Sequence, residues 1–187
     1  EYYAIVFQSR GKAAAWATLL GTVTALGVII SRTPLQAPAF LALTLGAAGG
    51  AVLAWGWGGR KSHLVWAALG FFYVGYLFPH LVVLHRFENG KAWVFFVLLV
   101  VMTADTAGYF VGSWLGKTKL APTISPNKTM EGAAAQVLGG TVAGFLAARV
   151  LLPAISSAEA SALALVLTWL GLGGDLFESW FKRTFAV

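Results

Sequence analysis

The chain has 187 residues, of which 58% are hydrophobic and 11% are charged, with a mean hydropathy of +0.76. This composition excludes an ordinary soluble domain and indicates an integral membrane protein, because several apolar runs exceed the roughly 18 residues that mark a spanning helix. The net charge of +6 does not indicate nucleic-acid binding, since the basic residues form short clusters between apolar runs, a pattern typical of membrane topology and of anionic lipid or phosphate partners.

Six hydrophobic segments of helical length follow one another, at about residues 13–31, 36–58, 63–84, 92–115, 133–152 and 159–181. Strands of a transmembrane barrel would instead alternate over about ten residues, and no such alternation occurs. We therefore predict an all-α fold, a polytopic integral membrane bundle of about six transmembrane helices. The whole chain, residues 1–187, is predicted to be a single transmembrane domain.

If the six segments cross in alternation, the basic residues divide unevenly between the two sides. One side receives nine: Arg10, Lys12, Arg60, Lys61, Lys117, Lys119, Lys128, Lys182 and Arg183. The other side receives four: Arg32, Arg86, Lys91 and Arg149. The positive-inside rule places the richer side in the cytoplasm. The connection at residues 116–132 is therefore predicted to be a cytoplasmic basic loop.

The first three segments carry no group that indicates chemistry. Three histidines, His63, His80 and His85, lie at or near the ends of the third segment, as is typical of a membrane interface, and no role is assigned to them. Small-xxx-small pairs occur at Gly46 with Gly50, Gly112 with Gly116 and Gly140 with Gly144. Such pairs let helix backbones approach closely. They predict packing within the chain and equally permit a homodimer.

The fourth segment contains an acid, Asp105, about ten residues and hence about 15 Å from its predicted cytoplasmic end. A carboxylate at the centre of a bilayer costs roughly 2.5 to 3.5 kcal/mol even on lenient scales, so it indicates a functional role by default. Thr103, Thr106 and Tyr109 are candidate local hydrogen-bond partners. A polar clamp between helices and a ligand-binding role remain open alternatives for Asp105.

The loop at residues 116–132 reads GKTKLAPTISPNKTMEG and contains three lysines and one acid. Lys117, Lys119 and Lys128 are mobile cationic donors, and Ser125 and Thr129 carry hydroxyls suited to phosphate oxygens. The alternative is a loop that only anchors the topology. Its position beside intramembrane acids favours anion binding.

The sixth segment ends in GDLFESWFKRTFAV and contains Asp175, Glu178 and Ser179. The two acids are three residues apart and fall on one helical face, where they are predicted to hold a hard divalent cation together with water and substrate phosphate. Lys182 and Arg183 follow at the basic end of the segment.

These motifs resemble those of the CDP-diacylglycerol synthase (phosphatidate cytidylyltransferase) family. Residues 105–112, DTAGYFVG, fit the family pattern D-[ST]-x-[AG]-Y-x-x-G, and the loop fits G-[KR]-x-K-L-[AS]-P-x-[IV]-S-P-x-K-T-x-E-G. Residues 179–183, SWFKR, fit the start of the signature S-x-[LIVMF]-K-R-x4-K-D, with residues 184–187 filling the spacer. The resemblance covers roughly residues 102 to 187.

The resemblance implies the transfer of cytidylate from CTP to phosphatidic acid, which gives CDP-diacylglycerol and pyrophosphate and requires Mg²⁺. It implies that Asp175 ligates the metal, with Glu178 as a second metal ligand or a supporting group. It also implies that Lys182, Arg183 and Asp105 belong to the catalytic site. The residues it implies for substrate binding are Lys117, Lys119, Ser125, Lys128, Thr129, Glu131 and Ser179. It also implies a bacterial inner-membrane enzyme whose active site faces the cytoplasm.

The second half of the family signature, with its further aspartates, would lie after Val187. We therefore expect the chain to be incomplete, at both ends, and inactive by itself. Two other functions remain open. A CTP-dependent lipid kinase of the polyprenol or phytol type would transfer a terminal phosphoryl group, and a transporter or scaffold would use buried acids without catalysis.

Overall fold

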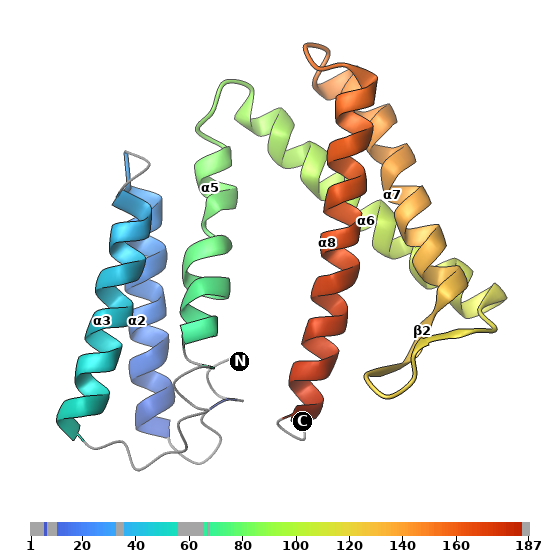
Figure 1. Cartoon of the computed structure of the whole chain (residues 1–187). Coiled ribbons are helices and arrows are strands. Elements are labelled where there is room, and N and C mark those ends of the chain that lie inside the picture. Colours follow the sequence, from blue (N-terminus) through green and yellow to red (C-terminus); the bar gives the residue numbers. More distant parts are fainter. Residues whose placement is uncertain (1–5, 7–10, 33–35, 56–65, 67, 185–187) are drawn as a thin grey trace. The chain divides into compact units, whose positions relative to one another are not determined.

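The computed structural model describes residues 6, 11–32, 36–55, 66 and 68–184. The chain forms two compact units, which we call the N-terminal unit, Glu1–Arg86, and the C-terminal unit, Phe87–Val187 (Figure 1). Within the described residues both units are mainly helical. The prediction of one transmembrane domain is not tested by this division and stays a prediction.

The N-terminal unit is built from α2 (Gly11–Ile30), α3 (Gln36–Trp55), the π-helix η1 (Phe71–Leu77) and α5 (His80–Leu84). Helix α2 packs against both α3 and η1. The buried hydroxyls of Thr24 and Thr44 lie 2.8 Å apart and hydrogen-bond across the α2–α3 contact. Helix pairs in a membrane are often joined in this way, because an unsatisfied hydroxyl in hydrocarbon is costly.

The third predicted segment, residues 63–84, is helical over its described part but irregular, which its apolar length did not indicate. Its described part is π-helical over Phe71–Leu77, turns at Phe78 and Pro79, and continues as α5. Phe78 donates to the carbonyl of Tyr73, five residues back, at 3.3 Å. The cause is Pro79, which has no N–H to continue the regular ladder and whose ring clashes with the preceding turn.

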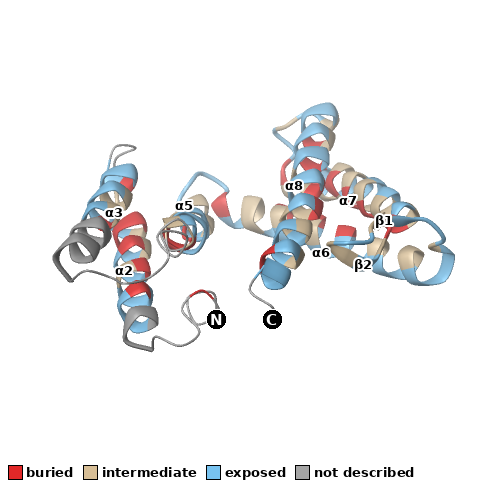
Figure 2. Cartoon of the chain, turned by 60° about the horizontal axis from the view of Figure 1, so that its bottom comes forward, coloured by how far each residue is buried: buried red, intermediate tan, exposed pale blue. Residues whose placement is uncertain are grey.

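The C-terminal unit contains α6 (Gly90–Leu115), a hairpin of β1 (Lys119–Ala121) and β2 (Ser125–Thr129), α7 (Met130–Leu151) and α8 (Ser157–Thr184). Every fourth residue of α7 is buried, from Gly132 through Gln136, Gly140 and Gly144 to Ala148. The opposite face exposes Leu138, Val142, Leu146 and Val150 (Figure 2). An apolar outer face of this kind suits a lipid environment.

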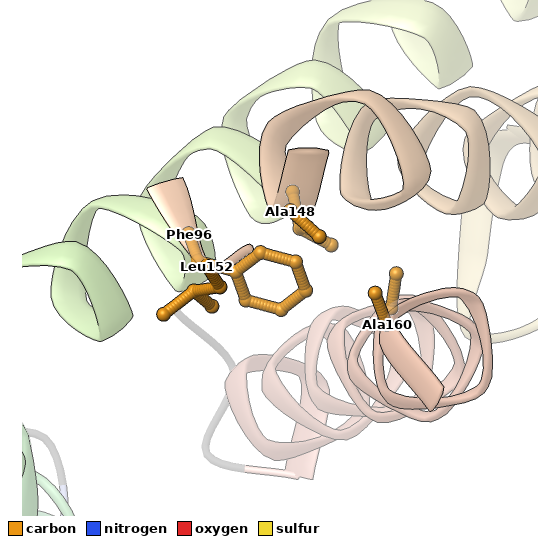
Figure 3. Packing of buried hydrophobic residues seen from close by; sticks show 6 residues of the cluster. Phe96, Ala148, Leu152 and Ala160 are labelled. Atoms are coloured by element: carbon orange, nitrogen blue, oxygen red, sulfur yellow. The ribbon is translucent and has the colours of Figure 1, made fainter. Parts of the chain in front are cut away.

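An apolar core lies at the end of the C-terminal unit where α7 turns into α8. Its buried residues are Phe96, Val100, Ala148, Leu152, Ala160 and Ala164 (Figure 3). The Phe96 ring, only 1% exposed, fills the space that the small alanines of α7 and α8 leave open. This core holds the three helices together at the end that does not carry the hairpin.

The all-α prediction is wrong at residues 116–132, because part of the predicted loop forms a two-stranded antiparallel sheet. Lys119 pairs with Thr129 and Ala121 pairs with Ser125, with a register shift between the two pairs. The prolines at 122 and 126 indicate a loop by local propensity. The strands pair nonetheless because α6 and α7 bring the two ends of the segment together, and Met130 N–H donates to Thr118 O at 2.9 Å.

Helices α6 and α7 approach closely at glycines. A Cβ added to Gly132 would lie 2.9 Å from Gly108 O and 3.0 Å from the Cα of Gly112. A Cβ on Gly140 would meet Thr168 of α8 and lie 2.8 Å from the Ala104 Cβ. Packing at Gly112, Gly140 and Gly144 is therefore confirmed, whereas a Cβ on Gly46 would have no described heavy atom within 4 Å.

Within the described residues, three helices are long and apolar enough to cross a membrane by length and composition, namely α6, α7 and α8. The described apolar stretches of the N-terminal unit, Ala15–Ile30, Gln36–Gly46 and Ala68–Leu84, are shorter. Six transmembrane helices therefore stay a prediction. Three basic residues of the predicted cytoplasmic side, Arg10, Arg60 and Lys61, lie outside the described residues, as do parts of the second and third predicted segments.

We predict that Gly140→Ala destabilises the protein by about 1 to 3 kcal/mol, because the added methyl group would overpack the contact with α6 and α8. The matched control is Gly171→Ala on α8, where an added Cβ meets no described heavy atom within 4 Å. There the gain in helix propensity is worth about 0.5 to 1 kcal/mol. Thermal unfolding in detergent micelles measures both, and equal stability of the two variants would contradict the packing role of Gly140.

Candidate functional site

A cavity of about 660 Å³ lies in the C-terminal unit between α6, the hairpin, the start of α7 and α8. Among its lining residues are six of the predicted site residues: Asp105, Lys119, Ser125, Lys128, Thr129 and Asp175. They come from three segments that are up to 70 residues apart in sequence (175 − 105). The fold thus brings two carboxylates, two lysines and two hydroxyls of the predicted site to one cavity.

An ion pair spans the cavity between the hairpin and α8. Lys128 Nζ lies 2.6 Å from Asp175 Oδ2, with the side chains 24% and 48% exposed, respectively. Because both side chains are partly solvated, the ion pair is weak, and another ion can replace either partner. Asp175 is therefore available to a cation and Lys128 to an anion.

A second polar pair joins α6 to α7 in the same cavity. Gln136 Nε2 donates to Asp105 Oδ1 at 2.9 Å, and Gln136 is only 6% exposed. The local partners predicted for Asp105 were Thr103, Thr106 and Tyr109, but its hydrogen bond comes from Gln136. Thr106 donates to Met102 O instead, and Tyr109 lines the cavity. Asp105 thus forms a polar clamp between α6 and α7 and also lines the cavity. Its ligand-binding role stays a prediction.

The junction of hairpin and α7 is held by two side chains of the predicted site. Thr129 is 5% exposed and caps α7 by accepting from the N–H of Gly132 at 3.1 Å. The Glu131 carboxylate accepts from the backbone N–H groups of Lys117 and Thr118 at 3.2 Å. Glu131 therefore closes the base of the hairpin and is not among the residues that line the cavity.

Six predicted site residues do not line the cavity: Lys117, Glu131, Glu178, Ser179, Lys182 and Arg183. Glu178 forms an ion pair with Lys182 on α8, 2.7 Å between Oε1 and Nζ. The two carboxylates that share the cavity are thus Asp175 and Asp105, and Glu178 lies outside it. Lys182 follows Asp175 by seven residues, two helical turns along the same face of α8.

Gln136 is the residue that the motifs did not single out. It is the single amide side chain in α7 and falls on the same four-residue stripe as Gly132 and Gly140. A lone amide on the packed stripe of a spanning helix was a usable signal, because a buried polar group in a membrane needs a partner. That partner, Asp105, lies 31 residues earlier, so spacing alone could not identify it.

The donors of this cavity fit a magnesium ion that is shared with a substrate. Mg²⁺ is bound in proteins by one or two carboxylates while substrate phosphates and water fill its other positions. Asp175, half-exposed on the cavity wall, supplies such a carboxylate. Among the described residues no cluster of three or more acids or histidines occurs. The cavity therefore suits a metal ion that is held partly by a carboxylate and partly by a substrate phosphate.

These features define an integral membrane protein whose spanning helices and hairpin enclose a cavity with charges of both signs. The chain matches the Cytidylyltransferase family over residues 1–187. It is 38% identical over 173 residues to the phosphatidate cytidylyltransferase of Brucella suis biovar 1 (strain 1330), which covers 92% of this chain and 60% of that protein. It is 34% identical over 116 residues to the phosphatidate cytidylyltransferase of Bacillus subtilis (strain 168), which covers 62% and 43%, respectively.

A third relative, the phosphatidate cytidylyltransferase of Mycobacterium bovis (strain ATCC BAA-935 / AF2122/97), is 37% identical over 100 residues, 54% of this chain. The chain therefore belongs to the cytidylyltransferase family. It spans 60% of the length of the Brucella suis protein.

We predict that Glu131→Ala loosens the base of the hairpin, because the N–H groups of Lys117 and Thr118 lose their acceptor. Amide hydrogen exchange at these two residues should accelerate about 5-fold or more. The matched control is Glu159→Ala, which removes a similar cap, on Ser156 at the far end of α8, and should leave the hairpin amides unchanged. Unchanged exchange at Lys117 and Thr118 in Glu131→Ala would refute the closing role.

Proposed function

We propose that the protein transfers cytidylate from CTP to phosphatidic acid, giving CDP-diacylglycerol and pyrophosphate for phospholipid synthesis. The observation that carries the proposal is the gathering of hairpin lysines and helix carboxylates around one cavity. It is supported by membership of the cytidylyltransferase family and by the names of the curated relatives. A bacterial inner membrane, with the hairpin on the cytoplasmic side, agrees with these relatives and with the positive-inside rule.

In this reaction a phosphate oxygen of phosphatidic acid forms a bond to the α-phosphorus of CTP. The bond between the α-phosphorus and the oxygen that links it to the β-phosphorus breaks, and this oxygen leaves with pyrophosphate. Both reactants are highly anionic, so catalysis depends on in-line positioning and on neutralising charge. Lys119 and Lys128 are placed to contact the triphosphate, assisted by Ser125 and Asn127 on the same hairpin. Lys117 and Thr129 support that hairpin at its base.

We assign Asp175 as the magnesium ligand. Asp105 lines the same cavity and is not needed for this role. When bound, Mg²⁺ would neutralise phosphate oxygens and favour departure of pyrophosphate. Lys128 must leave Asp175 for this to happen, and the triphosphate offers it a replacement anion. Lys128 would then pair with the triphosphate and Asp175 with magnesium, so neither side chain would be left as an unpaired charge in the cavity.

Lys182 and Arg183 lie in the last turn of α8. Helix α8 also contacts β2 and reaches the hairpin through Asp175. We assign both cations to the phosphate of the lipid substrate at the membrane surface, where Ser179 and Glu178 lie on the preceding turn. The Glu178–Lys182 pair, with exposures of 61% and 50%, is open enough for Lys182 to exchange its carboxylate for a lipid phosphate.

Asp175→Asn is expected to lower cytidylate transfer by about 100-fold or more, because an amide is a far weaker magnesium ligand than a carboxylate. The full-length protein in detergent micelles, given phosphatidic acid, magnesium and CTP labelled in the α-phosphate or in cytosine, measures the transfer as label in lipid. The matched control, Glu159→Gln, changes an acid on the same helix at its opposite end.

Full activity of Asp175→Asn would contradict the metal role. In the unchanged protein, lipid labelled only from the γ-phosphate of CTP would identify a kinase, and absence of label in any lipid would favour a transporter or scaffold.

Lys128→Met should raise the KM for CTP by about 10-fold or more, because it removes a charge-assisted contact to phosphate. It should also tighten magnesium binding in the absence of nucleotide, since Asp175 then has no competing cation. The control is Lys91→Met at the start of α6, at the end of the unit remote from the hairpin. Steady-state kinetics and titration of the metal would measure the two effects, and weaker magnesium binding in Lys128→Met would argue against the exchange.

A further inference from the structure

The Asp105–Gln136 pair offers hydrogen-bonding groups that the proposed mechanism does not use. Only Oδ1 of Asp105 and one N–H of the Gln136 amide are engaged in their mutual bond. In the described part of the chain, Asp105 Oδ2 and the second N–H of Gln136 Nε2 have no further hydrogen-bond partner. Both residues line the cavity. Asp105 is exposed to it, whereas Gln136 is only 6% exposed, and a buried donor without a partner indicates a ligand.

The orientation of the Gln136 amide follows from its partner. An ionised carboxylate only accepts hydrogen bonds, so the nitrogen and not the oxygen of the amide must face Asp105. The pair is held against the α6–α7 contact, where a Cβ on Gly108 would lie 3.0 Å from the Gln136 Cβ. The close approach of the two helices therefore fixes an acceptor, Asp105 Oδ2, beside a donor, the second Gln136 N–H.

An acceptor beside a donor is complementary to an amino group beside a ring nitrogen that carries no hydrogen. Cytosine presents this pair on its Watson–Crick edge. Asp and Glu carboxylates accept hydrogen bonds from the cytosine amino group when proteins read DNA bases. Uracil presents the reverse, a carbonyl beside a ring N–H, and would set acceptor against acceptor and donor against donor. We infer that Asp105 and Gln136 form the nucleobase subsite of the cavity and select cytosine over uracil, an inference that rests on the proposed function.

The position of the pair fits this role. Asp105 precedes Gly116, where the chain leaves α6 for the hairpin, by 11 residues (116 − 105), about 16 Å along the helix. The cationic side chains Lys119 and Lys128 are on the hairpin. A nucleotide whose triphosphate meets these lysines would direct its base towards Asp105 and Gln136.

The decisive experiment measures which nucleotides the full-length protein binds. Calorimetric titration in micelles with magnesium compares CTP, UTP and the 4-deamino analogue of CTP, which keeps the ring nitrogen but lacks the amino group. We expect CTP to bind at least about 100-fold more tightly than UTP and at least about 10-fold more tightly than the analogue. A ligand that leaves polar groups of the site without a hydrogen-bond partner binds with much lower affinity. Equal binding of CTP and the analogue would overturn the assignment without any mutation.

Asp105→Asn should reduce the preference for CTP over UTP by about 10-fold or more, because the new amide can donate to the uracil carbonyl and Gln136 can turn its oxygen to the ring N–H. Gln136→Met should weaken CTP binding and reduce the same preference. The matched control is Thr106→Val, the next residue on α6, whose hydroxyl bonds to Met102 O and which does not line the cavity. A purely structural role for Asp105 would lower binding of both nucleotides equally.

Two further outcomes separate the inference from the proposed function. If the unchanged protein labels lipid from CTP and Asp105→Asn alters the magnesium requirement while keeping the CTP preference, Asp105 is a metal ligand and only the nucleobase subsite is overturned. If the unchanged protein binds none of the nucleotides and labels no lipid, the proposed function fails and the subsite fails with it.

Discussion

The close contact between α6 and α7 is the constraint on which the C-terminal unit depends. Gly108 and Gly112 face Gly132, where an added Cβ would lie only 2.9 Å from Gly108 O and 3.0 Å from the Cα of Gly112. In a bilayer, helix association gains little from the hydrophobic effect and relies on van der Waals contact and interhelical hydrogen bonds. Small residues supply the first of these. The Asp105–Gln136 bond supplies the second at the same contact.

This contact also explains why a polar cavity can exist between membrane helices. The apolar core around Phe96 holds α6, α7 and α8 together at one end. At the other end the hairpin connects α6 to α7 and is fastened by Thr129 and Glu131. Backbone groups of non-helical segments at a membrane must find partners within the protein. The two side chains meet that requirement at the hairpin base, which leaves the hairpin lysines available to a ligand.

The Lys128–Asp175 ion pair sets the electrostatic state of the cavity. A lysine and an aspartate that neutralise each other remove the cost of two isolated charges near hydrocarbon. Because both side chains are partly exposed, the pair is not a rigid structural element. A ligand that brings both an anion and a cation, such as a magnesium-bound nucleotide, can replace each partner in turn. The ion pair is therefore compatible with the proposed reaction.

The third, fourth and sixth predicted segments show how far local patterns reach. The apolar lengths of the fourth and sixth agree with α6 and α8, because a spanning helix satisfies its own backbone and needs no distant partner. The third segment was predicted by its apolar length alone, which does not show the irregular helix before Pro79. The hairpin was also missed, since Pro126 in β2 argues against a strand locally. Only the fixed separation of α6 and α7 makes the two strands pair.

The amino-acid sequence by itself determined that this is a helical membrane protein with cationic and acidic motifs in its second half, because hydropathy, charge and motif order are properties of the chain. The tertiary structure decided which of these groups meet. It placed Asp105 beside Gln136 and Asp175 beside Lys128, and it left Glu178 with Lys182 outside the cavity. Such pairings join residues 31 and 47 positions apart, and depend on how helices pack, which no local spacing encodes.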